Sequence, residues 1–383
     1  MKILLLGDYS NVHATLAEGL RSLGHHVVVA SDGDGWKGYE RDVDLRRPSL
    51  GMWQSALWWL RVCRSFRKFR GFDVVQLINP VFLPLRGERI GRFYRYLRAH
   101  NKRVFLGAFG MDYYYVKACM DGHTFRYSDF NLGPDLRETS ENKQWLADWR
   151  DGAKGALNQY MAADCDGIIA GLYEYYVSYE PQFRDKLTYI PFPIRVSSQQ
   201  EAGEEPLAPA TRAAFQRLRS NPDAPVRFFV GIQRERSAYK GTDRMLEALE
   251  RVRLRYPQLT EIVKVESLPF HEYVKCMQGC HVILDQLYSY TPAMNALEAM
   301  AHGLVVVGGG ELENYDILGE RELRPIINVL PDSENIYNTL CRVVEERHRL
   351  PALSAQSVAY VRKHHDHVKV AAEYLNFWRQ RGA

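Results

Sequence analysis

Short apolar runs alternate with helical patterns through the first half of the chain. Between the first two runs, Val12, Leu16 and Leu20 recur at helical spacing, and Gly24 ends that pattern. Continuous apolar runs separated by helices are typical of a parallel sheet that is covered on both faces. The predicted strands are Ile3–Leu6, His26–Ala30, Asp73–Ile78, Arg103–Ala108, Gly167–Ala170 and Leu187–Ile190.

A second series of the same kind follows a polar, Pro-containing stretch at 196–212, which we interpret as a linker. With 383 residues, two domains are expected. We predict an N-terminal α/β domain over 1–195 and a C-terminal α/β domain over 196–361. The helical tail at about 362–383 carries Tyr374, Phe377 and Trp378 and is expected to pack back on the first domain. The strands predicted in the second series are Val226–Val230, Glu261–Val265, His281–Leu284, Leu304–Val307 and Pro325–Val329.

Composition narrows the class of protein. The formal net charge is only +4, so the chain as a whole is not a polyelectrolyte binder. None of the six cysteines forms a Cys-x-x-Cys pair, and we expect reduced thiols in a cytosolic protein. Cys276 and Cys280 would share one face of a helix. The run Ile3–Leu6 is too short for a signal-peptide core, and no run approaches the roughly 20 residues of a spanning helix. We expect a cytoplasmic protein, soluble or peripheral on the inner face of the membrane.

Ligands of open α/β sheets bind at the carboxyl ends of the strands, so we expect the chemistry in a cleft between the two sheets. Gly7 follows the first strand directly and would let a ligand approach the backbone, while Ser10 or Asn11 could cap the next helix. A tight turn without a ligand role is about equally compatible with this pattern. No G-x-G-x-x-G motif is present, which disfavours a dinucleotide-binding enzyme.

A cationic loop follows the first strand of the second series. It contains Arg234, Arg236 and Lys240, and Lys240-Gly241 directly precedes an amphipathic helix. Point charges beside a helix N-terminus suit the oxygens of a diphosphate. A solvated basic loop would have the same composition.

A second constellation runs from Asp285 to Gly303. Pro292 suits a first helical turn, and Glu298 follows in a helix of small and apolar residues. A carboxylate in that setting needs a partner, either the hydroxyls of a ribose or a core arginine.

These two constellations resemble the donor-site motifs of the large retaining GT-B glycosyltransferase family that includes sucrose synthases and mannosyltransferases. The similarity rests on Lys240–Asp243 with its preceding arginines and on the run Leu297–Val307, and it extends to Leu23–Val28 and Ile190–Ile194. The resemblance implies two Rossmann-like domains facing a central cleft and a nucleotide-sugar donor. It also implies that Arg234 or Arg236 and Lys240 hold the diphosphate, and that Glu298 binds the ribose.

The chain departs from the family pattern at one position. The family usually has a second glutamate eight positions before Glu298, where it bonds the transferred sugar, and here that position is Tyr290. In the first domain, Asp112 follows the strand at Arg103–Ala108 and could orient an acceptor hydroxyl, or could cap the next helix. The aromatics Tyr113–Tyr115 could stack on sugar rings or pack internally.

A basic, aromatic-rich stretch stands apart from these motifs. Residues 45–72 contain no acid but many arginines and several tryptophans, and a second basic helix follows at 89–103. This pattern suits an anionic membrane surface or a charged glycan acceptor. It is also compatible with a solvated face. No groove-reading or RNA-stacking motif accompanies it, so nucleic acid is not an expected partner.

The sequence thus predicts a glycosyltransferase that moves a sugar from a nucleotide-diphosphate sugar to a glycan, lipid-linked or small-molecule acceptor, with retention. Cations and a helix N-terminus would stabilise the leaving diphosphate in place of a metal. We also expect no Asp-x-Asp triplet after a strand, and therefore neither a metal nor another cofactor. An inverting reaction is also compatible with such a cleft. The alternatives are a nucleotide-sugar epimerase or phosphorylase on the same fold, and a catalytically silent homologue that binds a sugar or partner.

Overall fold

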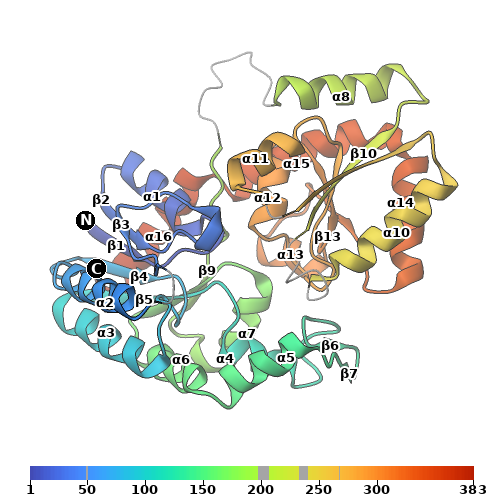
Figure 1. Cartoon of the computed structure of the whole chain (residues 1–383). Coiled ribbons are helices and arrows are strands. Elements are labelled where there is room, and N and C mark those ends of the chain that lie inside the picture. The colour runs from blue at the N-terminus through green and yellow to red at the C-terminus, as the bar shows by residue number, and fades with distance from the viewer. Residues whose placement is uncertain (49–50, 197–206, 233–239, 267) are drawn as a thin grey trace. The chain divides into compact units, whose positions relative to one another are not determined.

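The computed structural model describes residues 1–48, 51–196, 207–232, 240–266 and 268–383. The chain divides into two compact units (Figure 1). Unit 1 comprises Met1–Thr124, Ser140–Pro193 and His367–Ala383, and unit 2 comprises Phe125–Thr139 and Ile194–Asp366.

Unit 1 is built on a parallel sheet of the described residues in the order β3-β2-β1-β4-β5-β8-β9. Its central strands are buried on both faces, and Ile3–Leu6 are all 0% exposed. This burial explains why these strands are continuous apolar runs rather than alternating ones. The strands are β1 (Lys2–Leu6), β2 (His26–Ser31), β3 (Val43–Asp44), β4 (Val74–Leu77), β5 (Arg103–Ala108), β8 (Gly167–Ala170) and β9 (Leu187–Tyr189).

Helices flank this sheet and include the C-terminal helix of the chain. That helix packs along α1, where a side chain at Gly19 would meet the carbonyl oxygen of His367 at 2.2 Å. Trp378 is fully buried, and its indole N–H donates to Gln76 Oε1 of β4 at 3.3 Å. The helices are α1 (Val12–Ser22), α2 (Met52–Phe66), α3 (Gly87–His100), α4 (Tyr113–Cys119), α5 (Ser140–Trp145), α6 (Ala153–Asp164), α7 (Tyr173–Phe183) and α16 (His367–Gln380).

Unit 2 contains a second parallel sheet, in the order β11-β10-β12-β13-β14. Its strands are β10 (Val226–Ile232), β11 (Thr260–Glu266), β12 (Val282–Leu284), β13 (Val305–Gly308) and β14 (Ile327–Asn328). Its helices are α8 (Pro209–Ser220), α10 (Thr242–Arg255), α11 (Phe270–Met277), α12 (Met294–Ala301), α13 (Leu312–Ile317), α14 (Ser333–Glu345) and α15 (Leu350–His364).

The segment 125–139 belongs to unit 2, although the sequence assigned it to the N-terminal domain. It forms a small antiparallel pair, β6 (Asn131–Leu132) and β7 (Asp135–Leu136). Its short polar and aromatic residues give no strand or helix period, so nothing in the local pattern predicts that it joins the later half of the chain.

Both parallel sheets, and with them the α/β fold class, are confirmed. Every predicted strand is present, with ends shifted by at most a few residues. Some local expectations are wrong. Cys276 and Cys280 do not share a helix, because α11 ends at Met277 and Gln278 is extended. Pro292 precedes the helix α12, which begins at Met294. All six cysteines are free thiols. Among the described residues, no helix is long and apolar enough to cross a membrane.

Candidate functional site

The strand orders place a topological switch point in each unit. In unit 2 the switch lies between β10 and β12, because the chain leaves β10 for β11 on one side and returns to β12 on the other. In unit 1 it lies between β1 and β4. Loops at the carboxyl ends of such strand pairs form the usual ligand crevice of open α/β sheets. The candidate residues fall on these loops.

Lys240 and Gly241 form the turn into α10 at the unit 2 switch point. The backbone N–H of Leu287, from the loop after β12, donates to the Lys240 carbonyl at 3.0 Å. Gly241 has a φ of 72°, and a Cβ there would meet the side chains of Leu287 and Tyr288 at 2.7–2.8 Å. Only glycine fits this turn. The turn before the α10 N-terminus is therefore fixed directly against the loop 285–293.

The three consecutive glycines Gly308–Gly310, which begin at the last residue of β13, allow a close approach to the same loop. A Cβ at Gly309 would lie 2.2 Å from the carbonyl oxygen of Ser289, and one at Gly310 would lie 2.5 Å from the side chain of Ile326. The N–H of Glu311 then donates to the Tyr290 carbonyl at 3.0 Å. Backbone hydrogen bonds thus join the loops that follow β10, β12 and β13 at the carboxyl ends of these strands.

Glu298 lies in α12, the helix that follows the loop 285–293. Its side chain is 22% exposed, and its carboxylate pairs with His302 one turn later at 3.3 Å. The partner is therefore a histidine on the same helix rather than a core arginine. A partly exposed carboxylate of this kind is available to a ribose hydroxyl.

Tyr290 is buried and is held by the segment 125–127. Its hydroxyl accepts the backbone N–H of Arg126 at 2.7 Å, and its ring packs on Tyr127 with centroids 4.9 Å apart. Phe125 lies edge-on to the same ring at 5.7 Å. The position that carries the sugar-binding glutamate in the resembling family is thus an anchor for a distant segment of this chain.

Charged groups reinforce this anchor. The Arg126 guanidinium lies over the Tyr290 ring at 4.8 Å and pairs with Glu311 at 3.0 Å and with Glu313. The Tyr127 hydroxyl donates to Glu311 Oε1 at 2.6 Å. A cavity of about 760 Å³ lies beside this network, lined by Arg126, Tyr127, Leu132, Gly133, Glu311, Leu312, Glu313, Asp316, Leu330, Pro331 and Asp332.

The corresponding loop of unit 1 begins at Gly7. Gly7 has a φ of 79°, and a Cβ there would lie 2.4 Å from the Ile78 side chain, so close packing on the end of β4 requires the glycine. Asn11 occupies the N-cap position of α1, as expected, but its side chain makes no capping hydrogen bond. The carboxylate of Asp8 caps the helix instead, accepting the N–H groups of His13 at 3.0 Å and Ala14 at 3.2 Å.

Asp8 and His13 are both fully buried beside this loop. Burial raises the pKa of Asp8 to about 7. Burial also lowers the pKa of His13 to about 3, and its Nδ1 lies 2.7 Å from the Gly7 carbonyl. The other ring nitrogen, Nε2, has no partner among the described residues. An unsatisfied buried nitrogen of this kind is uncommon and marks the loop as a site candidate.

Left-handed backbone conformations gather at the same place. Ser10, Asn11 and Asp34 are the non-glycine residues with positive φ in the described chain, at 51°, 70° and 54°. The N–H of Ser10 donates to the Asp34 carboxylate at 2.8 Å, and Lys37 pairs with that carboxylate at 2.6 Å. Strained residues of this kind cluster at ligand sites.

Asp34 also belongs to the triplet Asp32-Gly33-Asp34, which directly follows β2. The expectation that no Asp-x-Asp triplet follows a strand is therefore wrong. In the structure the Asp32 carboxylate accepts the N–H of Asp34 at 3.0 Å. Among the described residues, no group of three or more His, Cys, Asp or Glu side chains gathers as metal ligands would.

Asp112 is the N-cap of α4. One carboxylate oxygen accepts the N–H of Tyr115 at 2.9 Å, and the other accepts the hydroxyl of Tyr179 at 2.7 Å. Burial raises its pKa to about 6. Tyr114 and Tyr115 are also buried. The geometry favours the capping interpretation of Asp112 and internal packing for these two tyrosines.

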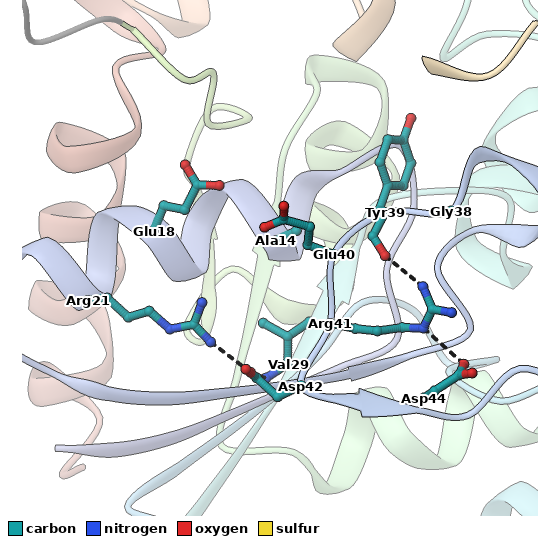
Figure 2. Close-up of a pocket in the computed structure, with 10 residues that line it drawn as sticks. All are labelled: Ala14, Glu18, Arg21, Val29, Gly38, Tyr39, Glu40, Arg41, Asp42 and Asp44. Atoms are coloured by element: carbon teal, nitrogen blue, oxygen red, sulfur yellow. Dashed lines mark hydrogen bonds and ion pairs between the residues drawn. The ribbon is translucent and has the colours of Figure 1, made fainter. Parts of the chain in front are cut away.

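A separate cavity of unit 1, of about 470 Å³, does not suit a diphosphate. Figure 2 shows its four carboxylates, those of Glu18, Glu40, Asp42 and Asp44. Arg21 pairs with Asp42 at 2.7 Å and Arg41 with Asp44 at 2.9 Å, so both arginines are neutralised (Figure 2). An excess of negative charge would repel an anionic donor. None of the predicted site residues lines this cavity.

Comparison with solved structures places the chain in a known fold. Sucrose-phosphate synthase from Thermosynechococcus elongatus superposes with a TM-score of 0.60 and 13% identity over 99% of each chain. WaaG, a glycosyltransferase involved in lipopolysaccharide biosynthesis, gives 0.58 and 12% over 98% of each chain. Anabaena HepE in complex with UDP-glucose gives 0.59 and 12% over 98% of this chain and 99% of HepE.

A UDP-GlcNAc 2-epimerase from Neisseria meningitidis, bound to UDP-GlcNAc, also superposes, with a TM-score of 0.55 and 10% identity over 99% of this chain and all of the epimerase. No family model matches the sequence. No curated protein matches it either. With two parallel-sheet units and neighbours of this kind, the chain has the GT-B fold, and at these identities the likeness establishes the fold alone.

The structure brings together some predicted site residues and not others. Lys240, Tyr290 and Glu298 all belong to loops or helices at the switch point of unit 2. Gly7 lies at the switch point of unit 1. Arg234 and Arg236 lie outside the described residues. Sequence reasoning missed Asp8 and His13, whose only signal is a polar pair just after a buried strand. It also missed Arg126 and Glu311, for which no local signal exists.

Proposed function

We propose that this protein is a glycosyltransferase that uses a nucleotide-diphosphate sugar as donor. The observation that carries the proposal is the backbone hydrogen bond from Leu287 to the Lys240 carbonyl, at the switch point of unit 2. It sets a lysine and the N-terminus of α10 beside the loop that leads to Glu298. A cation with aligned N–H groups suits a diphosphate, and a part-exposed carboxylate suits a ribose.

The finer features of the proposal rest on the family resemblance. The reaction would proceed with retention and without a metal, since Lys240, Arg234 or Arg236 and the α10 N-terminus would stabilise the departing diphosphate. Gly7 would contribute a ligand-facing turn at the carboxyl ends of the unit 1 strands. Asp112 is buried, and both of its carboxylate oxygens accept hydrogen bonds within unit 1, so we assign it no role in orienting an acceptor hydroxyl. The acceptor would be a glycan, a lipid-linked sugar or a small molecule. The protein would act in the cytoplasm, in solution or at the inner face of the membrane.

Two other functions are each favoured by one observation. The superposition on a UDP-GlcNAc 2-epimerase favours isomerisation of the donor. The burial of Tyr290 under residues 125–127 favours a silent homologue that binds a sugar without transferring it, because the usual sugar-binding glutamate is replaced by an anchor.

Incubation of the purified protein with a panel of nucleotide sugars separates these functions. A transferase consumes the donor and releases nucleoside diphosphate, slowly to water and faster when an acceptor mixture is added. Proton NMR couplings of the product then report the anomeric configuration, and we expect retention. Isomerised donor without release of nucleoside diphosphate would establish the epimerase. Donor binding with no product from any donor and acceptor would establish the silent homologue.

A further inference from the structure

Helix α2 exposes large apolar side chains on its outer face. Met52, Trp53, Leu57 and Leu60 are 86%, 85%, 66% and 64% exposed. At 100° per residue, Trp53, Leu57, Leu60 and Arg64 fall within one narrow stripe of the helix. Apolar side chains gathered in this way on a water-exposed surface usually mark an interaction site.

The exposed stripe is distinct from the face of α2 that packs on the core. The opposite face of α2 is also apolar, and Trp58, Val62 and Phe66 on that face are buried at no more than 4% exposure. Three residues of the helix therefore pack in the core, and the outer apolar residues remain mostly exposed to solvent.

Cations without acidic partners surround the stripe. Arg64, Arg67, Lys68 and Arg70 are exposed, and none forms an ion pair among the residues that the structure describes. Arg61 is also exposed, but it donates to the Arg46 carbonyl at 2.7 Å and interacts with the charge of Asp44. On the neighbouring helix α3, Arg89, Arg92 and Arg95 are likewise exposed and without an ion pair among the described residues, beside one acidic residue, Glu88.

The structure divides the basic residues of 45–103 into two sets. Arg98 pairs with Asp164 at 3.0 Å and also with Asp166, and Arg103 pairs with Asp166 at 3.2 Å. Lys102 pairs with Asp73. These three residues are neutralised within unit 1. The cations of α2 and of the first turns of α3 remain available to an external anion.

A groove between α2 and α3 continues the same surface. Its volume is about 670 Å³, its aromatic lining includes Trp59, Phe66, Phe93 and Tyr96, and Arg67, Arg89 and Arg92 contribute its cations. The Arg89 guanidinium lies over the Trp59 ring at 5.1 Å. An apolar groove with cationic side chains fits an amphiphile with an anionic head.

We propose that the outer face of α2, with the groove to α3, docks on an anionic lipid bilayer. Trp53, Leu57 and Leu60 enter the boundary between head groups and acyl chains, and Arg64 and Arg67 meet lipid phosphates. This docking is independent of the proposed transferase activity. Charge decides against a second copy of the same face, because two such faces would repel each other. Nucleic acid would satisfy the cations but leave the apolar stripe in water.

Co-sedimentation with vesicles tests the docking. The probes are vesicles of phosphatidylcholine alone and of phosphatidylcholine with phosphatidylglycerol. We expect binding only to the anionic vesicles and its loss at 0.5 M salt. The double variant Trp53→Ser/Leu57→Ser should lower the partition coefficient at least tenfold, because it removes apolar side chains from the acyl boundary. Arg64→Glu/Arg67→Glu should lower it at least as much, because it replaces attraction to the anionic surface with repulsion. The Trp53 emission should be quenched by lipid brominated in the acyl chain.

Matched controls come from unit 2. Leu254 is 80% exposed on α10, and Arg219 is exposed on α8, so Leu254→Ser and Arg219→Glu should leave binding unchanged. Equal binding to both vesicle types, unchanged binding of the double variants, or an equal loss in the controls would overturn the proposal. Sedimentation velocity in the absence of lipid provides a further test. A dimer that dissociates in the Trp53→Ser/Leu57→Ser variant would show that the face binds a second copy of the chain and would overturn the proposal. Donor turnover in lipid-free solution is measured separately, so failure of either proposal leaves the other standing.

Discussion

At the scale of single residues, the first loop of unit 1 combines three unusual features. Gly7, Ser10 and Asn11 have left-handed backbone, Asp8 is a buried carboxyl group, and His13 has a ring nitrogen without a partner among the described residues. Asp8 caps α1, so the negative charge of its carboxylate is attracted by the helix N-terminus. Burial of the carboxyl group disfavours that charge. Burial is the larger effect, because the pKa of Asp8 rises to about 7.

The raised pKa of Asp8 predicts a specific dependence of stability on pH. Between its ordinary pKa of 3.8 and about 7, the folded protein holds a proton that the unfolded chain has released. This contribution to the free energy of unfolding is fully present below pH 4 and is lost as the pH rises through 7. The buried His13 acts with the opposite sign, since its lowered pKa destabilises the fold as the pH falls below 6.5.

The variant Asp8→Asn isolates the carboxyl group from the histidine. Relative to this variant, the parent protein should gain on the order of 2–4 kcal/mol of unfolding free energy between pH 8 and pH 4, measured by urea denaturation. The control is Asp121→Asn, whose lowered pKa places its effect below pH 4. If the free energies of unfolding of Asp8→Asn and the parent protein differ by the same amount at every pH between 4 and 8, Asp8 is ionised in the folded protein over that range.

At the scale of elements, the segment 125–139 is the main departure from a simple two-domain chain. It leaves unit 1 after Thr124, adds β6 and β7 to unit 2, and returns at Ser140. Its attachment rests on Tyr290, through the Arg126 N–H, the Tyr127 ring and the Arg126 guanidinium. The tyrosine at the position where the resembling family has a glutamate is therefore the residue that holds this segment.

Tyr290→Phe tests whether the tyrosine serves the fold or the sugar. It keeps the ring but leaves the Arg126 N–H without its acceptor, which should lower the free energy of unfolding by about 1–3 kcal/mol. If Tyr290 is an anchor, KM for the donor changes less than threefold. The control Tyr256→Phe removes a surface hydroxyl that donates to Glu345, and it should change the free energy of unfolding far less. A large fall in kcat/KM with unchanged stability would instead give Tyr290 a direct sugar contact.

The elements also show which features the sequence could predict. Buried parallel strands leave a continuous apolar run, so β1, β5, β8 and β12 could be found from the residues alone. Lys240, Gly241 and Glu298 could be predicted because a glycine turn and a carboxylate in an apolar helix are local signals. The partners of Tyr290 could not, since Arg126 is 164 residues away and only the folded chain joins them. The capping role of Asp8 was missed because Ser10 and Asn11 are equally good caps by type.

At the scale of the whole molecule, the chain has a GT-B fold, and we propose a donor site in unit 2 and a separate lipid-facing surface on α2 of unit 1. The fold is established by the two parallel sheets and by neighbours such as sucrose-phosphate synthase. The proposed donor site matters most, because the proposals of a retaining reaction, of metal independence and of an acceptor class all require it.

Calorimetric titration with a nucleoside diphosphate and the matching monophosphate, beginning with UDP and UMP, tests this claim most directly. Lys240→Ala should lower the affinity for the diphosphate by one to two decades, because a lost charge-assisted hydrogen bond costs about 1.5–3 kcal/mol. It should lower the affinity for the monophosphate far less. Glu298→Ala should lower the affinities for the diphosphate and the monophosphate equally, because both ligands carry the ribose. Lys275→Ala, at an exposed lysine of α11, should bind like the parent. If Lys240→Ala binds the diphosphate as tightly as the parent protein, the donor site does not lie at the switch point of unit 2.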